Sequence, residues 1–250
     1  ALGVKNGSTL EMPAPGGDSV RELLAAVESG KISESDIDAR LSELLPLVFD
    51  TKAALDAAPR EFDAAAHHAL ARRAAEESLV LLKNEGALLP LAAGSKVAVI
   101  GDFAKNPRYQ GAGSSMVNST QVDVLLDKLI DSELNVIGYQ QGFDRHGKPD
   151  AALQKSACEL ATQADTVILC MGLDEIAESE GLDRSNLRLA QNQVDLLQAV
   201  AAANPKIVVV LYSGSVVETP WLDNCQALLY AALGGQAGAG AVADALAGKV

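Results

Sequence analysis

The apolar positions of the chain follow two different rhythms. Over the first third, apolar residues recur every three or four positions, which predicts amphipathic helices over residues 18–29, 33–48 and 63–84. Ser33 and Asp36 stand three residues apart at the start of the second helix, a spacing close to a capping box. The first part of the chain is therefore expected to be helical.

From Lys96 onward, continuous apolar runs replace the helical spacing. They cover residues 97–100, 136–139, 166–171, 207–212 and 227–233. Because these runs do not alternate with polar residues, we expect strands that are buried on both faces. Helical patterns separate most of them, so the sequence predicts an α/β fold. Its sheet is mostly parallel, with five or six strands and helices on both faces, a flavodoxin-like α/β sandwich preceded by a helical segment.

The charge and the cysteine content of the chain limit the classes of partner and the cellular compartment that we expect. The net charge of −13 disfavours contact with a phosphate backbone, so no nucleic acid is expected. No apolar run is long enough to predict a membrane span. The three cysteines have no metal-ligand spacing and indicate buried thiols in a reducing compartment. We therefore expect a bacterial cytoplasmic protein, although Ala1 is not an initiator methionine and a targeting segment could lie upstream.

Two long loops follow predicted strands, at the edge where parallel sheets bind ligands. The loop over residues 102–118 contains P-R-Y-Q-G-A-G-S-S, with glycines that allow close approach and hydroxyls that can hold a ligand. A phosphate cradle is conceivable, but neither G-x-G-x-x-G nor the Walker pattern is present. A tight turn without ligand is the alternative interpretation.

The loop over residues 172–189 gathers carboxylates and one arginine. These residues are Asp174, Glu175, Glu178, Glu180, Asp183 and Arg184. A solvated acidic loop or a calcium site would also fit, although the spacing is not that of an EF-hand. If the loop is functional, one carboxylate acts as a general acid, because crowded negative charges raise a pKa towards neutrality.

An ordered set of motifs resembles glycoside hydrolase family 3, the β-glucosidase and β-xylosidase group. The set runs through nearly the whole chain. It comprises L-E-M-P (10–13), E-E-S-L-V-L-L-K-N-E (76–85), L-L-P-L (88–91), V-A-V-I-G (97–101), P-R-Y-Q-G-A-G-S-S (107–115), E-S-E-G-L-D-R (178–184), L-Y-S-G-S-V-V-E-T-P-W (211–221) and A-L-G-G-Q-A-G-A-G (232–240). No single motif is decisive, but the order is specific.

The resemblance implies a division into three parts. Residues 1–50 would be the tail of an N-terminal (β/α)8-type barrel, residues 51–90 a helical linker, and residues 91–250 a C-terminally truncated α/β sandwich. Most of the barrel, with the nucleophile of the family, would lie outside this chain.

The resemblance also implies site roles. Glu180, the glutamate before glycine in E-G-L-D-R, would be the acid/base, with Glu178 as the fallback. The residues expected to contact the sugar are Gly111, Gly113, Ser114, Ser115, Asp183 and Arg184. The alternative for residues 111–115 is docking against the barrel, and the alternative for Asp183 and Arg184 is bracing of their own loop. The expected substrate is a β-linked glucoside or short oligosaccharide, with no cofactor and no metal.

Two classes of function follow. In the first, the chain is the C-terminal domain of a retaining β-glycosidase and is inactive alone. In the second, it is a non-catalytic flavodoxin-like module that binds a nucleotide, a phosphate or a partner domain. An anion bound at residues 111–115 would favour the second class.

Overall fold

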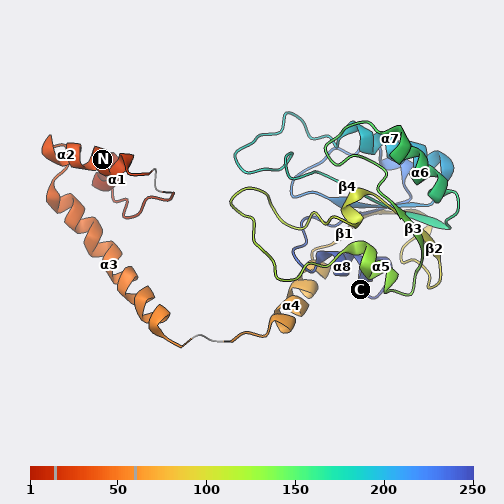
Figure 1. Cartoon of the computed structure of the whole chain (residues 1–250), viewed down its shortest axis with the longest axis horizontal. Helices are drawn as coiled ribbons and strands as arrows, with labels where there is room; N and C mark the ends of the chain where they lie inside the picture. Colours follow the sequence, from red (N-terminus) through yellow and green to blue (C-terminus); the bar gives the residue numbers. More distant parts are fainter. Residues whose placement is uncertain (14–15, 59–60) are drawn as a thin grey trace. The chain divides into compact units, whose positions relative to one another are not determined.

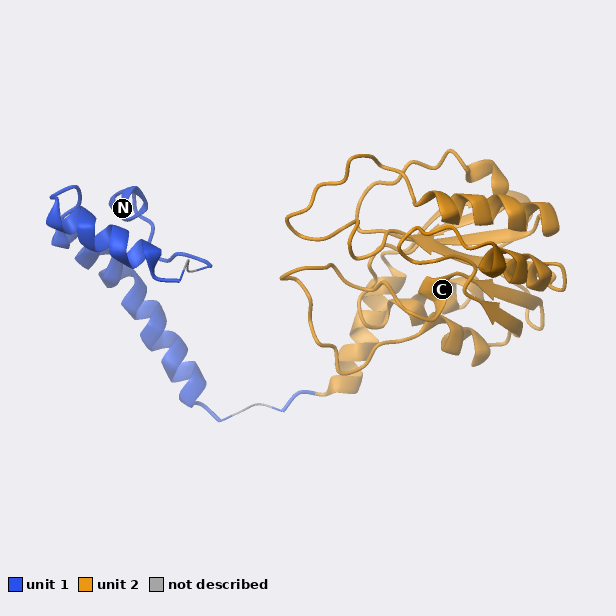
Figure 2. Ribbon diagram, turned by 45° about the horizontal axis from the view of Figure 1, so that its top comes forward, with its two compact units in different colours: residues 1–62 blue, residues 63–250 orange. Residues whose placement is uncertain are grey.

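The computed structural model describes residues 1–13, 16–58 and 61–250 and divides into two compact units. Unit 1 comprises Ala1–Phe62 and unit 2 comprises Asp63–Val250, coloured separately in Figure 2. Among the described residues, no helix is both long and apolar enough to cross a bilayer.

The described residues of unit 1 form three helices. They are α1 (Leu2–Lys5), α2 (Asp18–Glu28) and α3 (Glu34–Asp56). The capping box at the start of α3 is confirmed, because Asp36 N donates to Ser33 Oγ at 3.2 Å and Ser33 N donates to Asp36 Oδ2 at 2.8 Å. This box satisfies two backbone donors that the first turn of a helix leaves unpaired.

Unit 2 is built on one six-stranded sheet. The strands are β1 (Val80–Asn84), β2 (Lys96–Ile100), β3 (Asn135–Gln140), β4 (Thr166–Gly172), β5 (Ile207–Tyr212) and β6 (Ala227–Tyr230). Their order is β1-β6-β5-β4-β2-β3, and all neighbours except β1 and β6 are parallel. The five parallel strands have the flavodoxin-like order second-first-third-fourth-fifth, so the predicted fold is confirmed.

Five helices cover the two faces of this sheet. They are α4 (Ala64–Glu76), α5 (Leu125–Ile130), α6 (Ala151–Ala161), α7 (Gln191–Ala203) and α8 (Gly238–Leu246). Helices α6 and α7 lie on one face, and α4, α5 and α8 lie on the other (Figure 1). Every residue of β4 and β5 is buried, as expected for strands covered on both faces.

The helix expected over residues 63–84 is wrong beyond Glu76. Val80–Asn84 forms the edge strand β1, which pairs antiparallel with β6 in the register Val80↔Tyr230. The Asn84 side chain then closes a turn by donating to Leu89 O and accepting from Leu89 N, both at 2.9 Å. Backbone pairing with β6 therefore overrides the local helical pattern.

Candidate functional site

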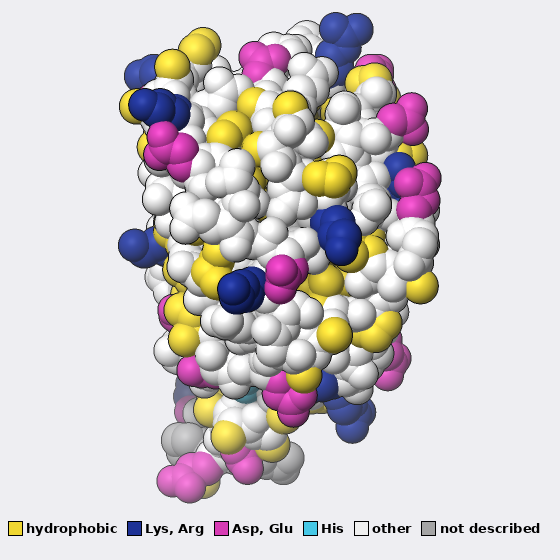
Figure 3. All heavy atoms as spheres, turned by 90° about the vertical axis from the view of Figure 1, so that its right-hand side faces the viewer, with side chains coloured by type: hydrophobic (Ala, Val, Ile, Leu, Met, Phe, Trp, Pro, Cys, Tyr) yellow, Lys and Arg dark blue, Asp and Glu magenta, His cyan; other side chains and the backbone are white. Residues whose placement is uncertain are grey.

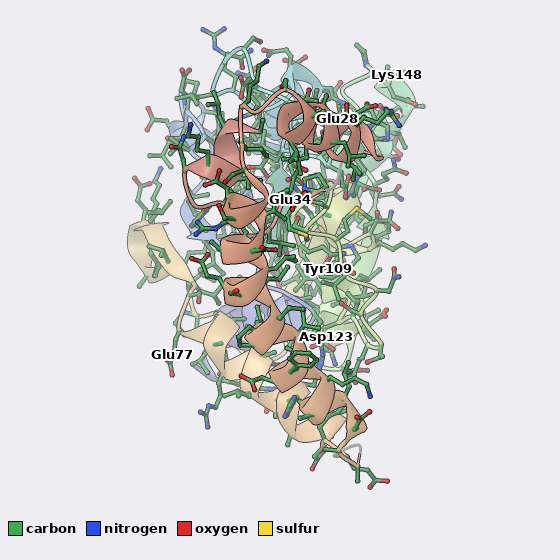
Figure 4. All side chains as sticks on the ribbon, turned by 90° about the vertical axis from the view of Figure 1, so that its left-hand side faces the viewer. Glu28, Glu34, Glu77, Tyr109, Asp123 and Lys148 are labelled. Carbon is green, nitrogen blue, oxygen red and sulfur yellow. The ribbon has the colours of Figure 1, made fainter. Side chains whose placement is uncertain are left out.

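The two long loops lie side by side beyond the carboxyl ends of the parallel strands (Figure 1). Ala112 and Ser179 form an isolated parallel bridge, and Glu180 N donates to Ala112 O at 3.4 Å. The first loop and the segment after it are also bound to residues that follow β6. Gly235 N donates to Tyr109 O at 2.9 Å and Asp123 N donates to Gln236 O at 2.8 Å, and Figure 4 labels Tyr109 and Asp123.

Glu180 is exposed and is held by the glycine-rich loop. Its Oε2 accepts a hydrogen bond from Ser114 N at 2.8 Å and another from the Ser114 hydroxyl. The hydroxyl bond first, and the amide bond second, lower the pKa of Glu180 below its ordinary value. The expectation that crowding would raise the pKa is therefore wrong for Glu180 in this structure.

Glu178, the fallback candidate, lies inside the loop cluster. Its Oε2 is 3.3 Å from Arg108 NH2 and accepts from Gly214 N at 3.0 Å, while its Oε1 accepts from the Ser215 hydroxyl. The Arg108 side chain is 1% exposed and that of Glu178 is 9% exposed. Glu178 therefore joins three loops, and Glu180 is the more accessible of the two carboxylates.

The loop around Gly113 has a defined shape. Gln110 closes its base, because its side-chain amide donates to Val117 O at 3.1 Å and its Oε1 accepts from Val117 N at 2.9 Å. Gly113 has φ +88°, and a Cβ on it would lie 2.7 Å from Glu180 Cβ. Ser115 Oγ turns back to Ala112 O at 3.5 Å. The supposed phosphate cradle thus already holds a carboxylate of the chain.

Asp183 and Arg184 lie on the ridge between two open cavities. Arg184 NH2 donates to Val216 O at 2.7 Å, so this arginine braces the loop, whereas Asp183 is exposed. Both residues line a cavity of about 580 Å³ beside α7 and another of about 450 Å³ beside Ser215. Glu178 also lines the cavity beside Ser215, together with Asp183 and Arg184.

The crevice at the topological switch point, between β2 and β4, is filled by an ion-pair cluster. Arg145 pairs with Asp102, donates from Nε to Glu175 Oε2 at 3.1 Å, and lies 4.5 Å from the ring centre of Phe103. Burial raises the pKa of Glu175, but hydrogen bonds from Arg145 outweigh this and the net direction is down. A nucleotide would have to displace this cluster.

The acidic loop does not assemble as a cation site. Asp174 pairs with His146, while Glu175, Glu178 and Glu180 have the separate partners described above. Over residues 1–13, 16–58 and 61–250, no three such side chains converge as metal ligands. The calcium interpretation therefore receives no geometric support.

The sequence did not single out Arg108, Arg145 and Gln110, although these residues organise the loops. A signal was present, since an arginine in a loop of an acidic chain has many carboxylates to pair with. The two arginines follow β2 and β3, at the edge where the acidic loop also begins.

The fold and the loop cluster define an α/β domain that presents a carboxylate at the carboxyl edge of its sheet. A family model for the glycosyl hydrolase family 3 C-terminal domain matches residues 79–250. The chain belongs to glycoside hydrolase family 3.

Alignments with similar proteins cover nearly the whole chain. An exo-α-(1→6)-L-arabinopyranosidase of Bifidobacterium breve is 41% identical over 98% of this chain. Thermostable β-glucosidase B of Acetivibrio thermocellus is 40% identical over 99%. The crystal structure of a family 3 β-glucosidase of Bifidobacterium adolescentis superposes with a TM-score of 0.88, at 42% identity, over 99% of this chain and 36% of that one.

The chain is shorter than these relatives. It spans 33% of the arabinopyranosidase and 33% of β-glucosidase B. The similarity therefore defines a C-terminal domain of glycoside hydrolases of the β-glucosidase and β-xylosidase type.

Proposed function

We propose that this chain supplies the general acid/base of a retaining β-glycosidase, and that Glu180 is that residue. The accessibility of Glu180 carries the proposal. Its carboxylate is exposed and accepts hydrogen bonds from the Ser114 amide and the Ser114 hydroxyl on one oxygen, Oε2. No described residue donates to Oε1. Glu178, in contrast, uses both oxygens inside the cluster.

The chemistry requires a second carboxylate. In a retaining glycosidase the nucleophile attacks the anomeric carbon while the acid protonates the leaving oxygen, and water then releases the sugar. The two carboxyl groups stand about 5 Å apart. We propose that the nucleophile belongs to a barrel domain of a longer protein, with residues 1–50 as the end of that barrel and residues 51–90 as the linker.

The pKa of Glu180 is low in this structure, whereas a general acid must be protonated. Covering the carboxylate with a sugar and a second domain would remove water and raise the pKa, because burial disfavours the charged form. A β-linked glucoside is the proposed substrate, in keeping with the β-glucosidases among the relatives.

The test is Glu180→Gln in the longer protein that we propose contains this chain. With a poor leaving group, kcat is expected to fall by about 10²–10⁴-fold, the usual contribution of general acid catalysis. Azide should restore turnover of an activated aryl β-glucoside and yield the β-glycosyl azide. Glu159→Gln, an exposed carboxylate of α6, is the matched control. Unchanged activity of Glu180→Gln would refute the proposal.

A second measurement concerns the chain alone. Residues 1–250, purified in folded form, are expected not to hydrolyse an aryl β-glucoside, because the proposed nucleophile is elsewhere. Sustained turnover by this chain, abolished by Glu180→Gln, would mean that both carboxylates lie within it.

A further inference from the structure

We propose that Ser114 is a positioning residue, whose amide and hydroxyl fix Oε2 of Glu180 and leave Oε1 as the oxygen that carries the proton. This inference rests on the proposed function of Glu180. It assigns different roles to the two oxygens of one carboxylate, and it makes Ser114 a holder of the acid/base instead of a sugar contact.

The hydrogen bonds give the first argument. Ser114 N lies 2.8 Å from Glu180 Oε2, and the Ser114 hydroxyl bonds to the same oxygen. An amide N–H can only donate, so Oε2 must accept in every protonation state of the glutamate. A proton on Oε2 would compete with both donors, whereas a proton on Oε1 leaves Oε2 as a carbonyl acceptor.

The shape of the loop gives the second argument. Gln110 fixes the base of the loop through its two hydrogen bonds to Val117, which places the Ser114 amide under Glu180. Gly113 lets the loop approach closely, since a Cβ there would be 2.7 Å from Glu180 Cβ and 3.1 Å from Oε2. The φ of +88° at Gly113 is also costly for any other residue.

This arrangement serves both halves of the reaction. In the first half, the proton on Oε1 passes to the glycosidic oxygen as its bond to the anomeric carbon breaks and the nucleophile bonds to that carbon. In the second half, Oε1 takes a proton from the water that attacks the anomeric carbon, and the bond to the nucleophile breaks. Oε2 keeps the same two donors throughout, so the carboxyl group does not need to reorient.

The first experiment uses residues 1–250 and does not depend on catalysis. The carboxyl ¹³C shift of Glu180, assigned with Glu180→Gln, is titrated by NMR in the wild type and in Ser114→Ala, Ser114→Thr and Ser115→Ala. Ser114→Ala should raise the pKa of Glu180, because it loses the hydroxyl donor but keeps the amide. Ser114→Thr should keep the low pKa. Ser115→Ala is the control, because its hydroxyl faces Ala112 O.

The second experiment uses the longer protein. Ser114→Ala should lower kcat about tenfold at unchanged KM, because an acid that is held less firmly spends less time in line with the leaving oxygen. The alkaline limb of kcat/KM should move to higher pH, since this limb reports the acid of the free enzyme. Ser114→Thr should restore both quantities.

The outcomes separate the inference from the proposed function. If Ser114→Ala leaves the pKa of Glu180 unchanged, or shifts it no more than Ser115→Ala does, the positioning role is wrong whatever Glu180 does in catalysis. If the pKa rises but Glu180→Gln retains full activity, the contact is real and the acid/base assignment fails. A rise in KM at constant kcat and an unmoved pH profile would instead make Ser114 a sugar contact.

Discussion

Helices α3 and α7 show how differently the two units are stabilised. Helix α3 has 23 residues and buries none of them, and Leu55 on it is 81% exposed. Helix α7 has 13 residues and buries Gln193, Leu196, Leu197 and Val200. Helix α3 thus rests on local interactions such as its capping box, whereas α7 rests on packing against the sheet, the usual source of helix stability in proteins.

The difference extends to the whole of each unit. Among the described residues of unit 1, the apolar side chains that are buried are Ala26 and Ile32. Unit 2 buries a continuous core that includes all of β4 and β5. The surface of unit 2 in Figure 3 carries charges of both signs with apolar atoms between them. Unit 2 is therefore expected to unfold cooperatively, while the helices of unit 1 open locally.

The largest expected effect comes from a truncation in the core of unit 2. Leu169 is fully buried in β4, between Ile100 of β2 and Val209 of β5. Leu169→Ala should lower the free energy of unfolding by about 3 kcal/mol, through lost burial and the cavity left behind. Denaturant unfolding, followed by the fluorescence of the single tryptophan, buried Trp221, measures this change.

The matched variant in unit 1 is Leu55→Ala. It should change the hydrogen exchange of α3 by less than about 0.5 kcal/mol, as for an exposed position. Leu82→Ala, on the exposed side of edge strand β1, tests the same rule within unit 2. If Leu55→Ala proved as costly as Leu169→Ala, the contrast between the units would be wrong.

Breaking a buried ion pair of unit 2 should also cost more stability than breaking an exposed pair of unit 1, although less than truncating Leu169. The Asp123 carboxylate is 2% exposed and lies 3.0 Å from Lys128 Nζ and 3.5 Å from Arg72 NH1. Asp123→Ala should cost about 2 kcal/mol, because it leaves these cations short of a partner, although both remain partly hydrated. The unfolding midpoint reported by Trp221 measures the loss.

The control pair in unit 1 lies largely exposed on the surface. The Asp18 and Arg21 side chains are 73% and 71% exposed. Asp18→Ala should change the exchange of α2 amides by about 0–1 kcal/mol, the range for surface pairs. Equal losses in the two variants would mean that burial does not decide the strength of these pairs.

The contrast also explains which strands the sequence could predict. Strands β2, β4, β5 and β6 were found because a parallel strand covered on both faces needs a continuous apolar run. The edge strand β3 also has an apolar run and was found, although none of its residues is buried. β1 is half exposed and directly follows a helical pattern, and its partner Tyr230 is far along the chain. This edge of the sheet was therefore missed, since the pairing of β1 is set by distant residues.

The candidate site also has features that the sequence predicted and features that depend on distant residues. The motif located the loop and two candidate glutamates, and the family resemblance favoured Glu180. The choice between Glu178 and Glu180 depends on Arg108, 70 residues away from Glu178, which places one carboxylate inside the cluster. The low pKa of Glu180 depends on Ser114, 66 residues away. Spacing within one loop contains neither fact.

The smallest expected effect is a difference in acid sensitivity. Burial raises the pKa of Glu175 and Arg145 lowers it further than burial raises it, so the folded form binds fewer protons than the unfolded one. The stabilisation is therefore present above the unfolded pKa of about 4.3 and is lost as the pH falls through the folded pKa. Glu175→Gln should lower the unfolding midpoint at pH 7, and its difference from the wild type should shrink at a pH below the unfolded pKa.

The counterpart in unit 1 is Asp36, whose pKa is lowered by its backbone and side-chain hydrogen bonds to Ser33. The same sign applies, but Asp36 is only partly buried, and its loss should affect only the first turn of α3. Asp36→Asn should speed exchange of the first amides of α3 at pH 7 and leave the Trp221 transition unchanged at both pH values. If Glu175→Gln also left the Trp221 transition unchanged and changed only nearby amide exchange, the ion-pair cluster at the switch point would not be part of the cooperative core.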